Sequence, residues 1–237
     1  MFITNIAKKI VNKIVYPHSY NNEVFVAYLR SKGAVIGKNT RFVAPKKSLV
    51  DAARLDYIEI GDNCCLSHCT IMAHDYSWYV LKDAYNAMLP DSGERVKIGN
   101  NVFIGYQAVI LKGTTIGDNC VIGARAVVKG NVPSNTVWGG VIAKQLCTLD
   151  DFYQKRLVRQ VSDAIYRRNH IREKYGRNPT EKEMGYFGFL FLERTEENFS
   201  KYLADLEFNG IKDDPSIRAL FFAIDPKYKS FEEFLNQ

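Results

Sequence analysis

Aliphatic residues recur along the middle of the chain at a period of six. From Ile98 onward one phase is kept, at Ile98, Ile104, Ile110, Ile116, Ile122 and Val128. Four positions after several of these come compact side chains, at Val102, Ala108, Thr114, Cys120 and Ala126. Fixed self-similarity indicates a repeat architecture in which each unit buries its apolar side by stacking on the next. Six residues make one short strand and one corner, so three units are predicted to form each turn of a parallel β-helix.

The same rule holds upstream in a different phase, and an interruption separates the two blocks. The upstream interior positions are expected at Ile36, Ile60, Leu66 and Met72. The separation between Met72 and Ile98 is not a multiple of six, so residues 75–95 are predicted to leave the wall as a loop. Long loops on rigid scaffolds commonly carry function.

Helical patterns flank the repeat on both sides. Residues 1–34 contain short amphipathic segments, and residues 148–237 contain helix start signals such as the capping boxes Thr180 to Glu183 and Ser230 to Glu233. The chain is therefore predicted to be mainly β, with an N-terminal helical segment over 1–34, a β-helix domain over 35–147 and an α-helical accessory domain over 148–237.

Composition and charge exclude several classes of protein. The 237 residues contain no apolar run near the roughly 18 residues that a membrane span needs. The five cysteines lack metal-ligand spacing, and no secretory signal is visible, so reduced thiols and a cytoplasmic protein are expected. Among the 32 basic and 26 acidic residues, no base-reading motif accompanies the positive excess, so no nucleic-acid partner is expected.

The positive excess lies at the N-terminus, where isoleucines have helical spacing. The stripe and its flanking lysines are Ile3, Ile6, Lys8, Lys9, Ile10, Lys13 and Ile14. One interpretation is an amphipathic helix on an anionic membrane surface, which would place the protein at the inner face of the membrane. The other, which we favour, is a helix that packs its stripe on the end of the β-helix or on a neighbouring subunit.

One histidine stands where the loop begins. His74 follows the last upstream repeat, and a neutral imidazole is suited to take a proton from a hydroxyl near neutral pH. Such a base needs an acceptor that fixes its tautomer, and Asp51 is the first candidate, with Asp56 and Asp75 as alternatives. His68 is expected to face solvent. Because the β-helix lacks a third histidine, no metal site is predicted.

The repeat, His74 before a long loop, and the downstream Ile98-Gly-Asn-Asn101 hexad together resemble the hexapeptide-repeat acyltransferases. Within that family the sequence is most similar to sugar and surface-polysaccharide O-acetyltransferases related to the maltose and galactoside enzymes. The resemblance extends over residues 28–144. It implies a left-handed β-helix, a homotrimer with active sites between subunits, acetyl-CoA as co-substrate, and His74 as general base with Asp51 on the acceptor side.

The resemblance also implies which residues contact the two substrates. Backbone amides at Gly105, Tyr106 and Ala124 would meet acetyl-CoA and stabilise the developing oxyanion, with Lys129 and Lys144 near its phosphates. In the loop, aromatic side chains could stack on a sugar ring or simply form the loop's own small core. Those assigned to the substrate are Tyr76, Trp78 and Tyr85.

The expected function is transfer of an acetyl group from acetyl-CoA to a hydroxyl of a sugar or surface glycan. Two alternatives stay open at this point. The first is N-acetylation of an amino sugar or of a xenobiotic, as in streptogramin acetyltransferases. The second is a non-catalytic scaffold built on the same β-helix.

Overall fold

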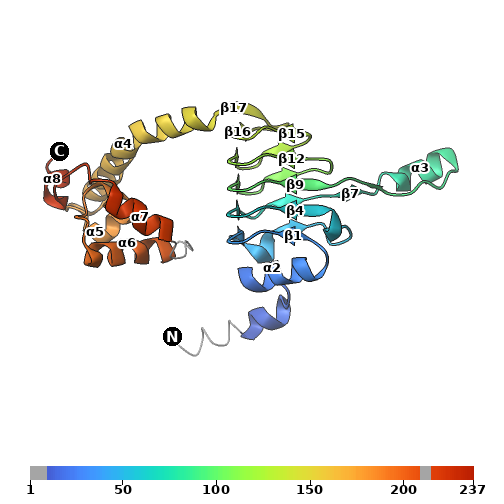
Figure 1. Cartoon of the computed structure of the whole chain (residues 1–237), viewed down its shortest axis with the longest axis horizontal. Coiled ribbons are helices and arrows are strands. Elements are labelled where there is room, and N and C mark those ends of the chain that lie inside the picture. Colours follow the sequence, from blue (N-terminus) through green and yellow to red (C-terminus); the bar gives the residue numbers. More distant parts are fainter. Residues whose placement is uncertain (1–9, 209–214) are drawn as a thin grey trace. The chain divides into compact units, whose positions relative to one another are not determined.

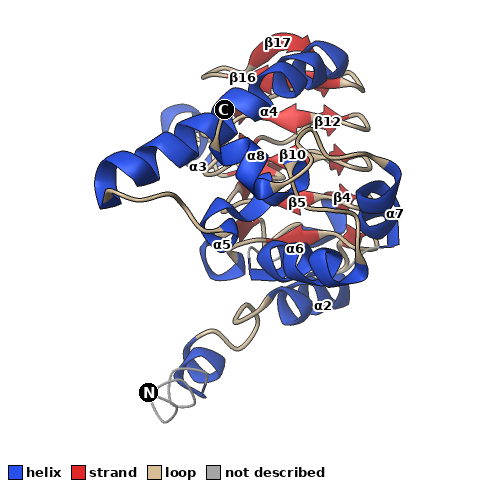
Figure 2. Cartoon of the chain, turned by 90° about the vertical axis from the view of Figure 1, so that its left-hand side faces the viewer, coloured by secondary structure: helices blue, strands red, loops and turns tan. Residues whose placement is uncertain are grey.

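The structure is a computed structural model that describes residues 10–208 and 215–237. It divides into two compact units, Met1–Phe152 and Tyr153–Gln237, and each is described by itself. Figure 1 traces both along the sequence, and Figure 2 distinguishes the strands of the first unit from the helices of the second by colour.

The first unit is a parallel β-helix with three walls. Wall 1 contains β1 (Val35–Ile36), β4 (Ile58–Ile60), β9 (Val96–Ile98), β12 (Thr115–Ile116) and β15 (Asn131–Val132). Wall 2 contains β2 (Arg41–Phe42), β5 (Cys65–Leu66), β10 (Phe103–Ile104), β13 (Val121–Ile122), β16 (Thr136–Gly139) and the antiparallel β17 (Lys144–Thr148). Wall 3 contains β3 (Leu49–Val50), β6 (Thr70–Ile71), β11 (Val109–Ile110) and β14 (Val127–Val128). The wall 1 strands form the column of rungs labelled in Figure 1.

The interior is a column of mostly aliphatic side chains contributed by the strands of the three walls. Ile98, Ile104, Ile110 and Ile116 are at most 1% exposed, as the period predicted. The compact residues between them are also buried, and Cys64 and Cys120 are free thiols in such positions. The prediction for Met72 is wrong: Ile71 fills the interior instead, because the preceding corner is one residue shorter than the repeat.

The corner between walls 1 and 2 repeats from coil to coil. Five asparagines there have positive φ values of 54–60°: Asn39, Asn63, Asn101, Asn119 and Asn135. Their side chains form a ladder, in which Asn101 Nδ2 donates to Asn119 Oδ1 (2.8 Å) and Asn119 Nδ2 donates to Asn135 Oδ1 (3.0 Å). Asparagine tolerates the left-handed conformation that this tight corner requires.

The interruption of the repeat is a projecting arm. It leaves through β7 (His74–Asp75), continues as helix α3 (Trp78–Tyr85) and returns through β8 (Ser92–Gly93). The two strands pair antiparallel, with His74 opposite Gly93 and Asp75 opposite Ser92. Figure 1 shows α3 at the far end of this arm, away from the wall. The arm therefore leaves from, and returns to, the corner between walls 3 and 1.

Helix α2 (Asn22–Ser31) packs at the first coil. Asn21 accepts the amide of Val24 as its N-cap, and the chain turns at Gly33, whose φ is +103°. Preceding it, residues 10–15 are helical, and Ile10 and Ile14 are exposed. The remaining members of the predicted stripe, Ile3, Ile6, Lys8 and Lys9, lie outside the described residues.

The second unit is helical. Helix α4 (Leu149–Tyr175) begins at the end of the first unit, and most of it belongs to the second. It is followed by α5 (Glu181–Met184), a 3₁₀ segment (Gly185–Leu190), α6 (Glu196–Phe208), α7 (Pro215–Ala223) and α8 (Phe231–Leu235). The capping box of Thr180 and Glu183 is present. Ser230 accepts the Glu233 amide, but Glu233 accepts from Lys229 rather than from Ser230. The core of this unit includes the consecutive apolar residues Leu190, Phe191 and Leu192.

Helical residues outnumber strand residues in the described ranges, because each wall uses strands of only two to five residues. "Mainly β" thus fits the first unit rather than the chain. In residues 10–208 and 215–237, the helices are too short or too polar to cross a bilayer.

Candidate active site

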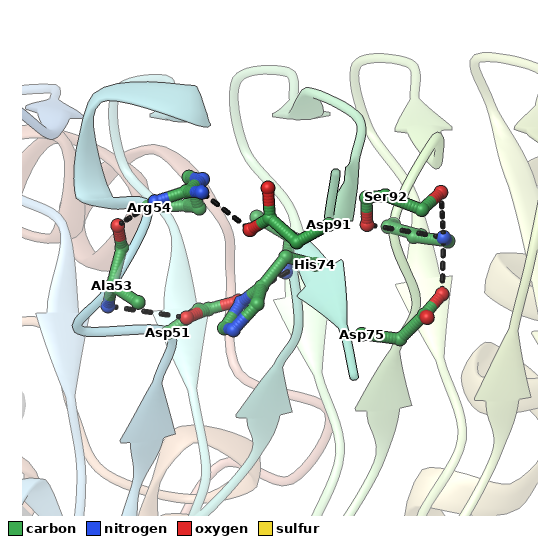
Figure 3. A network of polar contacts seen from close by, with 9 residues as sticks. Asp51, Ala53, Arg54, His74, Asp75, Asp91 and Ser92 are labelled. Atoms are coloured by element: carbon green, nitrogen blue, oxygen red, sulfur yellow. Dashed lines mark hydrogen bonds and ion pairs between the residues drawn. The ribbon is translucent and has the colours of Figure 1, made fainter. Parts of the chain in front are cut away.

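His74 occupies the corner between walls 3 and 1, at the first residue of the arm. Its side chain is 7% exposed, and it lies against Asp51 from the preceding coil, where β3 ends. Nδ1 of His74 is 2.5 Å from Oδ2 of Asp51. Figure 3 shows the imidazole and this carboxylate facing each other. The structure therefore brings together the two residues predicted as base and orienting carboxylate.

Asp51 is held in place by backbone amides. Its Oδ2 accepts the N–H groups of Ala73 (2.8 Å) and His74 (3.0 Å), and its Oδ1 accepts that of Ala53 (3.2 Å). Burial raises the pKa of Asp51, but the hydrogen bonds from His74, Ala73 and Ala53 outweigh it, so the net pKa is lowered. Asp51 is ionised at neutral pH and can only accept hydrogen bonds.

The ionised carboxylate of Asp51 fixes the tautomer of the His74 imidazole. Because the ionised carboxylate only accepts, the proton of a neutral His74 must lie on Nδ1, and Nε2 must carry the lone pair. Nε2 is buried and has no hydrogen-bond partner in the described part of the chain. A buried polar atom without a partner is uncommon, and here it is the atom that a general base would use.

An open pocket of about 370 Å³ adjoins His74. Its lining contains Tyr76 and Trp78, two of the aromatic residues assigned to the substrate, together with Ala53, Arg54, Met88, Leu89 and Asp91. The ring of Tyr76 meets the imidazole edge-on, with centroids 4.8 Å apart. Tyr85, at the end of α3, is exposed and does not line this pocket. Asp56, one of the alternative carboxylates, lies in a 3₁₀ turn (Leu55–Tyr57) and does not line it either.

Two ion pairs that the sequence did not reveal fasten the arm. Arg54 pairs with Asp91, and Lys112 pairs with Asp75. The hydrogen bond from Lys112 holds the pKa of Asp75 well below its usual range. Figure 3 shows Arg54 directed toward Asp91, and Asp75 beside Ser92. Each pair joins residues 37 positions apart, so no local pattern could have indicated them.

The predicted cofactor residues lie at other places. Tyr106 and Ala124 are exposed at the corner between walls 2 and 3, on successive coils. Gly105 is buried, and its amide donates to Ile122 O (2.8 Å), so that amide is not available to a ligand. A Cβ there would lie 2.6 Å from the Ala124 nitrogen, which explains the glycine by close packing.

The two predicted lysines are exposed. Lys129 follows β14 at the corner between walls 3 and 1, and Lys144 begins β17. The chain therefore places His74 and Lys129 at one corner, and Tyr106 and Ala124 at another.

His68 and Cys69, which precede His74 in the sequence, are both packed against other parts of the protein. His68 does not face solvent as expected; it is half-buried, and its ring packs edge-on against Tyr106 with centroids 5.0 Å apart. Burial raises the pKa of Cys69, five residues before His74, to about 12, so this thiol stays protonated and is a poor nucleophile. In the described ranges, no group of three or more His, Cys, Asp or Glu side chains is arranged to hold a metal ion.

Known proteins share the six-residue repeat of this chain. Residues 95–130 match the family described as bacterial transferase hexapeptide (six repeats). Protein CapG of Staphylococcus aureus is 34% identical over 130 residues, which cover 54% of this chain and 74% of CapG. Galactoside O-acetyltransferase of Escherichia coli is 37% identical, covering 40% of this chain and 47% of that protein.

A third relative is the putative lipopolysaccharide biosynthesis O-acetyl transferase WbbJ of Escherichia coli, 34% identical over 40% of this chain and 52% of its own length. The chain thus spans about half the length of the two relatives named as O-acetyltransferases. The β-helix is accordingly the left-handed one that the resemblance implied. The chain belongs to the bacterial hexapeptide-repeat transferase family, and the prediction of an acyltransferase is confirmed at the level of that family.

Proposed function

We propose that this protein transfers an acetyl group from acetyl-CoA to a hydroxyl of a sugar or surface glycan, with His74 as general base. The observation that carries the proposal is the His74–Asp51 pair: Nε2 of His74 has no partner among the described residues, and His74 lines a pocket together with aromatic side chains. The names of the galactoside and lipopolysaccharide relatives support a glycan acceptor.

The chemistry follows from the tautomer. Nε2 of His74 accepts the hydroxyl proton as the hydroxyl oxygen attacks the thioester carbonyl carbon, and the carbon–sulfur bond breaks. The resulting imidazolium donates its proton to the departing sulfur, while Asp51 stabilises the positive charge through Nδ1–H. We assign the backbone amides of Tyr106 and Ala124 to the carbonyl oxygen, where they would stabilise the negative charge that develops on it.

A homotrimer fits the distribution of these residues. In one chain, the base and the proposed cofactor amides lie at different corners of a three-walled prism. A site formed where the corner carrying His74 meets a neighbour's corner carrying Tyr106 would unite them. Sedimentation velocity measures the oligomeric state directly, and a stable, fully active monomer would refute the proposal.

The central test is His74→Ala, with His170→Ala as a matched control, since His170 is exposed on α4. Acetylated product would be followed by mass spectrometry with acetyl-CoA and a panel of galactosides and nucleotide-linked sugars. Loss of a general base should lower kcat by on the order of 10²–10⁴. A folded His74→Ala protein that keeps most of its activity would contradict the mechanism.

The same panel separates the acceptor chemistries. Amino sugars presented beside the matching hydroxyl sugars would show whether nitrogen or oxygen is acetylated. Product stability in mild alkali distinguishes them, because esters hydrolyse and amides persist. Exclusive transfer to nitrogen would replace the proposal with the N-acetyltransferase alternative.

Membrane association of the N-terminal stripe is the alternative to the packing role that we favour, and it has its own test. The exposed Ile10 and Ile14 lie on the described part of the N-terminal stripe, with Lys13 beside them. Flotation with anionic vesicles at low salt, comparing the full chain with one lacking residues 1–16, tests whether this segment binds lipid. Equal and negligible binding by both would leave packing against protein as its role.

A further inference from the structure

The arm is fastened to the next coil by a single ammonium group. Lys112 lies at the corner between walls 3 and 1, just after β11, and forms an ion pair with Asp75 Oδ2. Its Nζ also reaches the carbonyl oxygen (3.1 Å) and Oγ (2.5 Å) of Ser92. Lysine has three N–H donors, and here three acceptors surround them. Since Asp75 and Ser92 are opposite each other in the β7–β8 pair, Lys112 holds both strands of the arm at one rung.

The strand alternation gives His74 and Asp75 different anchors. Successive side chains of a strand point to opposite sides. His74 is directed to Asp51 in the preceding coil, whereas Asp75 contacts Lys112 in the following coil. Asp51 holds the ring of His74 and its backbone amide, independently of Lys112.

The pocket wall, in contrast, depends on the arm. Tyr76, Trp78, Met88 and Leu89 all lie between β7 and β8, and all line the pocket beside His74. The rung held by Lys112 is at the base of this segment. Freeing that rung would leave Arg54–Asp91 as the remaining ion pair of the two that fasten the arm, so these four side chains would move more while the base stays in place.

Exposed ion pairs contribute little to the stability of a protein, but the Lys112–Asp75 pair has additional hydrogen-bond partners. The Lys112 side chain is 22% exposed and Asp75 is 40% exposed, and Ser92 adds two further acceptors. The comparable pair on wall 1, Lys97 with Glu59, has a 3.4 Å separation and exposures of 59% and 51%. Lys97 therefore provides a matched control that also joins neighbouring coils but does not touch the arm.

We propose that Lys112 is a positioning residue for the acceptor: it fixes the arm so that the pocket keeps its shape, while Asp51 positions the base. The kinetic part of this inference rests on the proposed function, whereas the structural part does not. The division of labour predicts that loss of Lys112 weakens acceptor binding more than it slows the chemical step.

The first experiment measures hydrogen–deuterium exchange of the arm in the full-length protein. Lys112→Met should speed exchange of amides in residues 74–93 about tenfold, because the rung opens more often. Lys112→Arg and Lys97→Met should exchange as the wild type does. Asp75→Asn, which removes the other half of the pair, is the second variant if Lys112→Met fails to fold. Unchanged exchange of the arm in a folded variant would overturn the inference.

The second experiment measures steady-state kinetics with acetyl-CoA and methyl β-galactoside. For Lys112→Met we expect the KM of the galactoside to rise about tenfold, with kcat and the KM of acetyl-CoA within about twofold of the wild type. A fall in kcat with unchanged acceptor KM would overturn the assignment. If the wild type acetylates no acceptor, the proposed function fails, and the exchange experiment alone still decides whether Lys112 fastens the arm.

Discussion

Two corners of the same β-helix follow opposite rules. At the corner between walls 1 and 2, asparagine recurs on five coils with one backbone conformation. At the corner between walls 3 and 1, successive coils carry His74, Lys112 and Lys129. Both corners join short strands of the same prism, but the second also carries the arm and a different set of side chains.

The difference is one of hydrogen-bond satisfaction. Asn119 donates to the asparagine above it and accepts from the one below, so the repeat satisfies its own polar groups. At the other corner, the buried Nε2 of His74 has no partner within the described residues. A polar atom left unsatisfied costs stability unless a ligand uses it. The corner between walls 1 and 2, the regular corner, therefore stabilises the fold. The corner between walls 3 and 1, the irregular corner, carries the unpaired nitrogen that the proposed function uses.

The largest effect is expected for Asp51→Ala. The variant removes the partner of His74 Nδ1 and the acceptor of the Ala73 and His74 amides. We expect kcat to fall by on the order of 10²–10⁴ through loss of the fixed tautomer, and the free energy of unfolding to fall by about 2–4 kcal/mol. Kinetics and urea denaturation measure the two effects. Full activity in this variant would mean that His74 needs no carboxylate.

Gly99→Ala tests the regular corner by packing. A Cβ at Gly99 would collide with Asp118 Oδ1 and lie 2.8 Å from the Gly117 carbonyl carbon. We expect a loss of about 2–3 kcal/mol in the free energy of unfolding, with kcat unchanged. Gly130, at the irregular corner, has open space around it but a φ of +85°, so Gly130→Ala should cost only about 1 kcal/mol. If both variants lost the same free energy of unfolding, neighbouring coils could move apart at Gly99 more easily than the short contacts imply.

Much of the β-helix could be predicted because a period fixes both the strands and their interior residues. The failure at Met72 has a specific cause. Leu66 and Ile71 are interior residues separated by five positions instead of six, and both Ile71 and Met72 are apolar. Hydrophobicity alone cannot distinguish a full corner from one shortened by a residue.

The site could be predicted only in part. The contact between His74 and Asp51 could be predicted because chemistry and resemblance pointed to the same corner, and the catalytic roles of the two residues stay predictions. Lys112 and Arg54 looked like ordinary surface charges, and their partners lie 37 positions away along the chain. The Gly105 amide looked like a donor to a ligand, but the ladder between coils already uses it. Contacts between coils determine these roles, and a repeat does not specify which coil-to-coil contacts are polar.

A smaller effect is expected for the asparagine ladder. Asn119→Ala removes two side-chain hydrogen bonds and places alanine at a φ of 56°. We expect about 1–2 kcal/mol less stability and no change in kcat. Asn119→Gly removes the same hydrogen bonds without the conformational cost and should lose less. If the two variants were equally destabilised, hydrogen bonding rather than backbone conformation would account for the asparagine.

The smallest effect is expected in how the free energy of unfolding changes at acidic pH. The pKa of Asp51 is lowered from its ordinary value of 3.8, because hydrogen bonds to the carboxylate outweigh its burial. Its ionised form therefore stabilises the folded state above pH 3.8, and this contribution is lost as the pH falls through the lowered folded-state pKa. The stability advantage of the wild type over Asp51→Asn should thus be constant above about pH 5 and shrink below it. Asp83→Asn is the control, because the Asp83 side chain is 72% exposed. Denaturation at a series of pH values measures both differences. An advantage that grows on acidification would mean that burial, rather than hydrogen bonding, dominates at Asp51.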